Sequence, residues 1–190
     1  MSTILALDIS GVPRAWVTQD DAISYHAKNL VAWSLGEVIA RYNGGYCKDG
    51  VRSYLETPSI IAIRGESFDF NKNKKVILTN KTLFARDRNT CAYCGSRHSN
   101  HQKLSRDHII PKCDGGVDEW NNVVTACMPC NQEKGCMSLK KANMQLIYVP
   151  YAPNHYENLL LQNRHILADQ MEYLLSGVPK NSRARLLAAA

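Results

Sequence analysis

The stretch CAYCG at residues 91–95, together with CMPCN at residues 127–131, decides the fold of the middle of this chain. Each stretch holds two cysteines separated by two residues, a spacing that lets both thiolates reach one metal ion. Two such pairs supply the four sulfur ligands of a tetrahedral zinc site, whereas unmetallated buried thiols are the less favoured reading. The sequence therefore predicts a structural zinc ion held by Cys91, Cys94, Cys127 and Cys130.

This zinc site is expected to brace the fold and not to catalyse a reaction. Four protein ligands leave no coordination position for water or substrate, so the energy of zinc binding goes into folding the region. The segment 95–126 between the two pairs is longer than in the simplest zinc ribbons, which indicates an insertion. Any catalytic groups must come from residues other than the four cysteines.

Composition describes a folded, moderately basic protein. The chain has 190 residues, with 23 lysines and arginines against 17 acidic residues, for a formal net charge of +6. This balance is compatible with a polyanionic partner without establishing one. No run approaches the roughly 20 apolar residues of a membrane span, so we expect no membrane association and a cytoplasmic location. Seven cysteines are an odd number, and those outside the two pairs are interpreted as free thiols without a known role: Cys47, Cys113 and Cys136.

Composition, together with the prolines and glycines that end helices and strands, divides the chain into three parts. Residues 1–75 are interpreted as a small α+β platform, with a strand over residues 4–9, a helix capped by Thr18 and a strand within residues 59–65. Residues 76–145 carry the cysteine pairs. Residues 146–190 are interpreted as a C-terminal helical extension, because apolar residues recur at helical spacing from Leu160 to Leu175. We expect one amphipathic helix there, packed on the protein in preference to forming a dimer interface.

Several short motifs around and between the cysteine pairs occur in a fixed order. They are LFARDRNTCAYCG at 83–95, DHIIP at 107–111, the glycines 115–116, WNNVV at 120–124 and CNQEKG at 130–135. Each motif alone is weak, but in this order and spacing the segment from about residue 79 to 140 strongly resembles the HNH endonucleases. The resemblance implies an α+β protein with a ββα-metal core that is braced by the four-cysteine zinc site.

The resemblance also implies roles for particular residues. Asp107 and Asn131 would supply oxygen ligands to a catalytic divalent cation, Mg²⁺ first and Mn²⁺ or Ni²⁺ as alternatives. Asp107 and His108 are neighbours in an expected strand, so their side chains point to opposite faces and take different tasks. His108 would be the general base that activates water, since an imidazole can accept a proton near neutral pH. Asn122 would position the loop and the histidine through hydrogen bonds.

The expected function is metal-dependent hydrolysis of DNA phosphodiester bonds, by nicking or by double-strand cleavage. Arg106, Lys112 and Lys134 are candidates for contacts with DNA phosphates, although a solvated helix lysine is an equally good reading of Lys134. One centre of this kind cuts one strand, so a homodimer or a protein partner that directs cleavage is a further expectation. Two alternatives stay open at this point, a non-catalytic zinc module that binds nucleic acid and an RNA-directed nuclease.

Overall fold

A computed structural model describes residues 3–65, 76–163 and 165–187 of the chain. Residue contacts divide the chain into two compact units, each of which mixes helices and strands. The first unit is Met1–Lys74 together with Asn163–Ala190, and the second is Lys75–Gln162. Residues 146–162 of the expected C-terminal extension therefore belong with the segment that carries the cysteine pairs, and the rest belongs with the N-terminal part. Among the described helices, none is long and apolar enough to cross a membrane.

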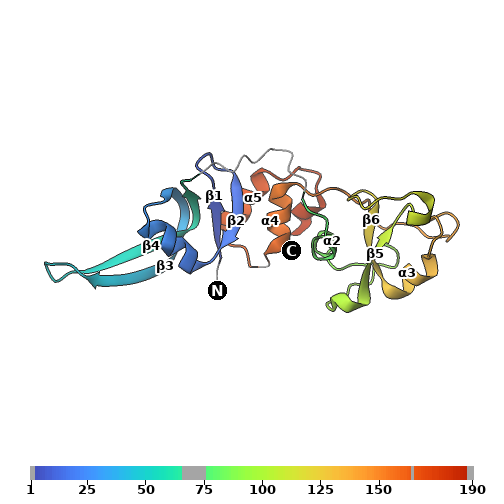
Figure 1. The fold of residues 1–190 in the computed structure, drawn as a ribbon, viewed down its shortest axis with the longest axis horizontal. Coiled ribbons are helices and arrows are strands. Elements are labelled where there is room, and N and C mark those ends of the chain that lie inside the picture. The colour runs from blue at the N-terminus through green and yellow to red at the C-terminus, as the bar shows by residue number, and fades with distance from the viewer. Residues whose placement is uncertain (1–2, 66–75, 164, 188–190) are drawn as a thin grey trace. The chain divides into compact units, whose positions relative to one another are not determined.

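The first unit is built on a four-stranded sheet with the strand order β2-β1-β4-β3 (Figure 1). Strand β1 (Ile4–Leu7) runs antiparallel to β2 (Pro13–Val17) and parallel to β4 (Arg52–Ile63), and β4 pairs antiparallel with β3 (Val31–Tyr46). The short apolar strand β1 is fully buried in the sheet interior. This explains why its sequence is a continuous apolar run without alternation.

Helix α1 (Gln19–Ala27) begins where the sequence predicted it. Thr18 is the N-cap, and its hydroxyl accepts a hydrogen bond from the backbone N–H of Asp21 at 3.1 Å. The Asp21 carboxylate accepts in return from the Thr18 backbone, which completes a capping box. The helix contributes the buried Ala22 to a core that also contains Ile4 and Ile61. The predictions of a strand near residue 4 and a helix after Thr18 are confirmed.

The expected single C-terminal helix is wrong, because two helices occupy this region. Helix α4 (His155–Gln162) ends before Asn163, whose side-chain oxygen accepts a hydrogen bond from the backbone N–H of His165 at 3.1 Å. This local turn competes with helix continuation. Helix α5 (Ala168–Ser176) then begins and packs on the first unit's sheet, where Gln170 donates to the backbone oxygen of Ser59 at 2.8 Å. The apolar periodicity thus serves two different cores.

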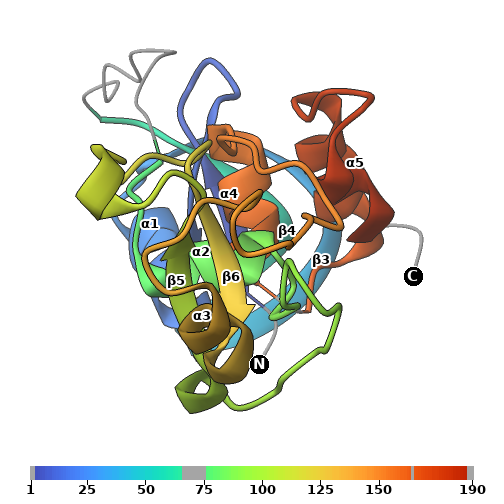
Figure 2. The same cartoon turned by 90° about the vertical axis from the view of Figure 1, so that its right-hand side faces the viewer.

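The second unit contains two antiparallel strands followed directly by a helix (Figures 1 and 2). Strand β5 (Leu104–His108) pairs with β6 (Val123–Cys127), and α3 (Met128–Lys134) starts at the next residue. Helix α2 (Asn80–Arg86) packs against the strands and against α4. Short 3-10 turns cover His101–Lys103 and Lys112–Asp114, and another covers Arg183–Leu187 in the first unit. The hydrophobic core of the second unit consists of Leu83, Phe84, Leu104, Trp120 and Val123.

A buried arginine ties the parts of the second unit together. The side chain of Arg86 is fully buried and forms two hydrogen bonds with Asp87, at 2.9 and 3.0 Å. Its remaining N–H groups donate to the backbone oxygens of Trp120, Val123 and Tyr151 at 2.7 to 2.9 Å. Asp87 also accepts from the backbone N–H of Thr125 at 2.9 Å. One guanidinium therefore links α2, the loop before β6 and the segment before α4.

Replacing Arg86 with methionine is expected to lower the free energy of unfolding of the second unit by about 3–5 kcal/mol. The substitution leaves the Asp87 carboxylate buried without its cation and three backbone oxygens without a donor. Urea unfolding of the zinc-loaded protein measures the change. Arg97→Met, at an exposed position of the same unit, is the matched control and should change stability by less than about 0.5 kcal/mol. Equal stability of the two variants would contradict the role of Arg86.

Candidate functional site

The four cysteines of the two pairs lie together in the second unit. Cys91 and Cys94 come from the turn after α2, and Cys127 and Cys130 lie at the end of β6 and in α3. Their sulfur atoms all lie within 4.8 Å of one another, and those of Cys94 and Cys127 are 3.8 Å apart. Zinc–sulfur bonds of about 2.3 Å in a tetrahedron place the sulfurs about 3.8 Å apart, so the cluster has the dimensions of a zinc site. In the described part of the chain, no other cluster of three histidine, cysteine or acidic side chains has this geometry.

The thiols of the cluster have opposed acid–base tendencies. A hydrogen bond with the Ser96 hydroxyl lowers the pKa of Cys94 to about 6, so this thiol ionises readily. Burial raises the pKa of Cys127 and of Cys130, because a thiolate is poorly solvated there. Four thiolates this close repel one another unless a cation lies between them. The chemistry of this donor set therefore fits Zn²⁺, which stabilises all four in the ionised form.

One face of β5 meets helix α3 through a buried charge pair. The Asp107 carboxylate is 3.2 Å from the Lys134 ammonium and accepts a hydrogen bond from the Tyr93 hydroxyl. Burial, together with the hydrogen bond to Asp107, raises the pKa of Tyr93 far above its ordinary value. The Lys134 ammonium also donates to the backbone oxygen of His108 at 2.7 Å. Lys134 is completely buried, so the structure does not place it on a surface that a DNA phosphate would touch.

The residues expected to hold a divalent cation do not form an open site. Both oxygens of Asp107 already have partners, Lys134 on one and Tyr93 on the other. The Asn131 amide nitrogen donates to the Ser105 hydroxyl at 2.7 Å. A divalent ion beside Asp107 would meet the Lys134 ammonium at short range, in a buried position where charge repulsion is strong. As these residues lie, they do not fit such an ion, and its coordination by Asp107 and Asn131 stays a prediction.

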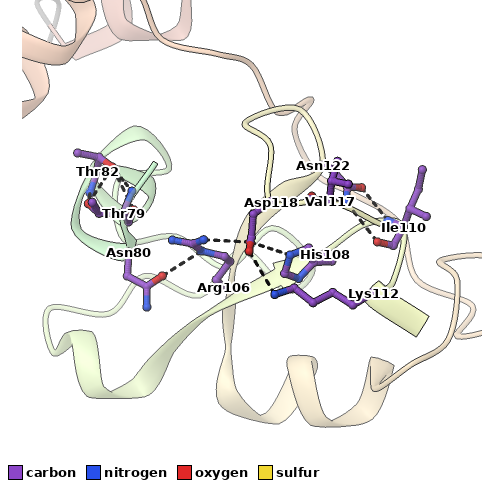
Figure 3. A network of polar contacts seen from close by, with 10 residues as sticks. All are labelled: Thr79, Asn80, Thr82, Arg106, His108, Ile110, Lys112, Val117, Asp118 and Asn122. Carbon is purple, nitrogen blue, oxygen red and sulfur yellow. Dashed lines mark hydrogen bonds and ion pairs between the residues drawn. The ribbon is translucent and has the colours of Figure 1, made fainter. Parts of the chain in front are cut away.

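His108 points to the opposite face of β5 and faces an acidic residue. Its ring nitrogen Nε2 lies 2.9 Å from the Asp118 carboxylate (Figure 3). The same carboxylate accepts from the Arg106 guanidinium at 3.0 Å and from the Lys112 ammonium at 3.2 Å. Hydrogen bonds from Arg106 and Lys112 hold the pKa of Asp118 well below its ordinary value, so this carboxylate is an anion. Three donor side chains thus converge on one negative group.

Asp118 is the residue of this cluster that the sequence analysis missed. It lies in the loop that joins β5 to β6, and the pairing of His108 with Val123 brings this loop back past the end of β5. The signal that could have identified it is an acidic residue in the loop that begins directly after the candidate histidine. The side chain of Asp118 is 45% exposed and that of His108 is 14% exposed, so the cluster opens to solvent.

Asn122 holds the loop that follows His108. Its side-chain oxygen accepts from the backbone N–H of Ile110 at 2.9 Å, and its amide donates to the backbone oxygens of Val117 and Ile110 at 2.9 and 3.2 Å (Figure 3). Gly116 permits this tight loop, since a Cβ atom there would lie 1.7 Å from the backbone oxygen of Ile110. These are the contacts of a residue that fixes a loop. Asn121, its neighbour, is exposed.

Residues 91–147 match the family model of the HNH endonucleases. This segment is an HNH endonuclease domain. The domain includes all four cysteines, both strands of the β5–β6 hairpin, α3 and the cluster around His108 and Asp118. The resemblance noted from the sequence is thereby confirmed for this segment, and the rest of the chain lies outside the match. No curated protein and no solved structure matches the chain.

Proposed function

We propose that the chain is an HNH endonuclease that hydrolyses phosphodiester bonds in DNA, with His108 as the general base. One observation carries the proposal: the HNH domain presents His108 at the surface, in contact with an anion that is also held by Arg106 and Lys112. A neutral imidazole is a base, and the two cations are suited to phosphate oxygens. The alternative function, a non-catalytic zinc module that only binds nucleic acid, does not require a histidine placed among such charged side chains.

The proposed reaction uses water as the nucleophile. His108 takes a proton from water, the water oxygen forms a bond to phosphorus, and the bond from phosphorus to the 3′ oxygen breaks. The leaving 3′ oxygen takes up a proton, so the products carry a 5′ phosphate and a 3′ hydroxyl. Arg106 and Lys112 stabilise the negative charge that develops on the phosphoryl oxygens. Asn122 keeps the loop after His108 in place and does not touch the substrate.

The position of the Asp118 carboxylate marks where a phosphate would bind. Arg106, His108 and Lys112 are arranged around an anion, and a DNA phosphate offers oxygens of the same charge and similar hydrogen-bonding capacity. Asp118 therefore competes with the substrate for Arg106 and Lys112, and its displacement by a phosphate leaves His108 Nε2 available to accept a proton from water. The contacts are partly exposed, so each is weak enough for a phosphate to displace it.

Asp118→Asn is expected to tighten DNA binding by about threefold to tenfold at low salt, because the variant lacks the competing negative charge. Fluorescence anisotropy of a labelled duplex, with His108→Ala also present in every protein compared, measures the affinity without cleavage. Asp114→Asn, an exposed acidic position in the same loop, is the control for a general charge effect. Tighter binding in both variants, or weaker binding in Asp118→Asn, would refute the competition.

The resemblance to HNH endonucleases implies a catalytic divalent cation. Where such a cation would bind in this domain is a question separate from the roles of His108, Arg106 and Lys112. We propose a ββα-metal core braced by Zn²⁺, but the reaction steps above use only the side chains of this chain, because Asp107 is engaged by Lys134. Binding of Mg²⁺ at Asp107 and Asn131 would require Lys134 to leave its present partners. Cleavage assays with Mg²⁺, Mn²⁺, Ni²⁺ and EDTA therefore test whether cleavage depends on a divalent cation.

The deciding experiment for the proposed function is a substrate panel with the zinc-loaded full chain. Supercoiled plasmid, linear duplex and single-stranded RNA are each incubated with the three divalent cations or with EDTA. Nicked or linear plasmid whose nicks are sealed by DNA ligase, which requires a 5′ phosphate and a 3′ hydroxyl, is the expected result. Cleavage of RNA alone would favour the RNA-directed alternative. No cleavage of any substrate with any cation would favour the non-catalytic zinc module.

A further inference from the structure

The longest strands of the chain form a ribbon that leaves its sheet. Strands β3 and β4 continue together well beyond the short strands β1 and β2, as Figure 1 shows for the first unit. Strand β1 pairs with β4 only at Ile60, Ile61 and Ala62. We call residues 40–57 the arm. Within the described part of the chain, no further strand pairs with the arm.

The turn at the end of the arm is closed by hydrogen bonds within the arm. The backbone N–H of Cys47 donates to the oxygen of Val51 at 2.7 Å, and that of Gly50 donates to Cys47 at 2.9 Å, which closes the turn. Gly50 has a φ of +79°, a conformation that favours glycine. Isolated two-stranded ribbons are only marginally stable in water. A long ribbon whose residues 43–54 are all exposed therefore indicates a surface built for a partner.

One face of the arm combines arginine, tyrosine and asparagine. Cross-strand partners share a face, and so do alternate residues along a strand. The pairs on this face are Arg41 with Glu56, Asn43 with Tyr54 and Tyr46 with Arg52. The Arg41 guanidinium lies 3.8 Å from the centre of the Tyr54 ring, and that of Arg52 lies 5.9 Å from the Tyr46 ring. Arg41 also lies 3.8 Å from the Glu56 carboxylate and stays 56% exposed, and the Arg52 Nε–H donates to the backbone oxygen of Gly44 at 3.2 Å, so both guanidinium groups keep further N–H donors free for a partner.

We propose that the arm enters the major groove of duplex DNA, with Arg41, Asn43 and Arg52 facing the base edges. The major groove of about 12 Å admits a two-stranded ribbon, arginine pairs with guanine, and asparagine pairs with adenine. Lys48, in the exposed turn, contacts a backbone phosphate. The choice of DNA as partner rests on the proposed function of the HNH domain. A protein partner or a second copy of the chain could pack on the same tyrosines, but its binding would not require the hydrogen-bond donors of the two arginines and the asparagine.

Binding measurements separate the arm from catalysis when every protein compared also carries His108→Ala, which removes the proposed general base. Wild type, Arg41→Ala/Arg52→Ala and Asn43→Ala are compared on a randomised duplex pool and on the sequences selected from it. The double variant is expected to bind the selected duplex at least tenfold more weakly, and Asn43→Ala to lose the preference at one position. Lys28→Ala, an exposed basic position at the end of α1 in the same unit, is the matched control and should bind like wild type.

A second double variant controls for the possibility that the alanine substitutions unfold the arm. Arg41→Lys/Arg52→Lys keeps the charge but not the paired donors of the guanidinium, so it should retain non-selective binding and lose sequence preference. Equal affinity and preference in the wild type and in all arm variants would overturn the proposal, even if the protein nicks DNA. A change of oligomeric state in sedimentation without a change of DNA affinity would assign the arm to self-association instead. Arm-dependent binding by a protein that cleaves nothing would sustain the arm and refute the proposed function.

Discussion

Cys127→Ser is expected to unfold the second unit and to abolish stoichiometric zinc binding. The four sulfur atoms lie within 4.8 Å of one another, and Cys127 is buried at the junction of β6 and α3. Structural zinc sites contribute about 10–16 kcal/mol in apparent binding energy, which exceeds or equals the whole stability of an ordinary domain. Elemental analysis measures the loss of zinc. Limited proteolysis within residues 76–162 measures the unfolding of the second unit. The first unit has its own core and should stay resistant to protease.

Cys113→Ser is the matched control for this prediction. Cys113 is exposed, lies outside the cluster and contacts only the backbone oxygen of Cys136 among its described hydrogen bonds, at 3.5 Å. The control should retain one zinc ion per chain and the protease resistance of the wild type. If Cys127→Ser also retained zinc and resisted protease, the four cysteines would not form the brace of this domain.

The cysteine pairs made the four-cysteine cluster predictable, because a two-residue spacing fixes how two thiols can meet on one ion. The capped start of α1 was predictable for a similar reason, since a threonine followed three residues later by an acid is a local signal. Asn122 was expected to position the loop and the histidine, and its side chain forms hydrogen bonds with Ile110 and Val117 of that loop, while its role at His108 stays a prediction. In all three cases the relevant partners are close in sequence or fixed by spacing.

The features that escaped prediction depend on residues distant in sequence. The charge of Arg86 would ordinarily favour the surface, but the residue is buried because Asp87 and three backbone oxygens surround its guanidinium. Lys134 is buried for a comparable reason, since Asp107 and the His108 oxygen receive its ammonium. The arm was missed because Gly44 and Gly45 suggest a turn, whereas both glycines lie within β3. Cross-strand pairing with β4 overrides that local preference.

His108→Ala is expected to slow phosphodiester cleavage by about 10²–10⁴-fold, the usual contribution of a general base. The loss should arise in the chemical step and leave DNA affinity nearly unchanged, because Arg106 and Lys112 still provide the positive charge. The fold should also survive, since the side chain of His108 contacts an exposed loop residue and the zinc ligands are untouched. His165→Ala, which removes an exposed histidine in the first unit, is the matched control and should cleave at the wild-type rate.

The single-turnover rate of nicking of supercoiled plasmid, for the wild type and His108→Ala at equal zinc content, tests the central claim most directly. The account predicts that the wild type converts the plasmid to the open circle, that the variant does so at least a hundredfold more slowly, and that both bind the plasmid equally well. Equal nicking rates in the two proteins would contradict it, because the base that activates water would then lie elsewhere.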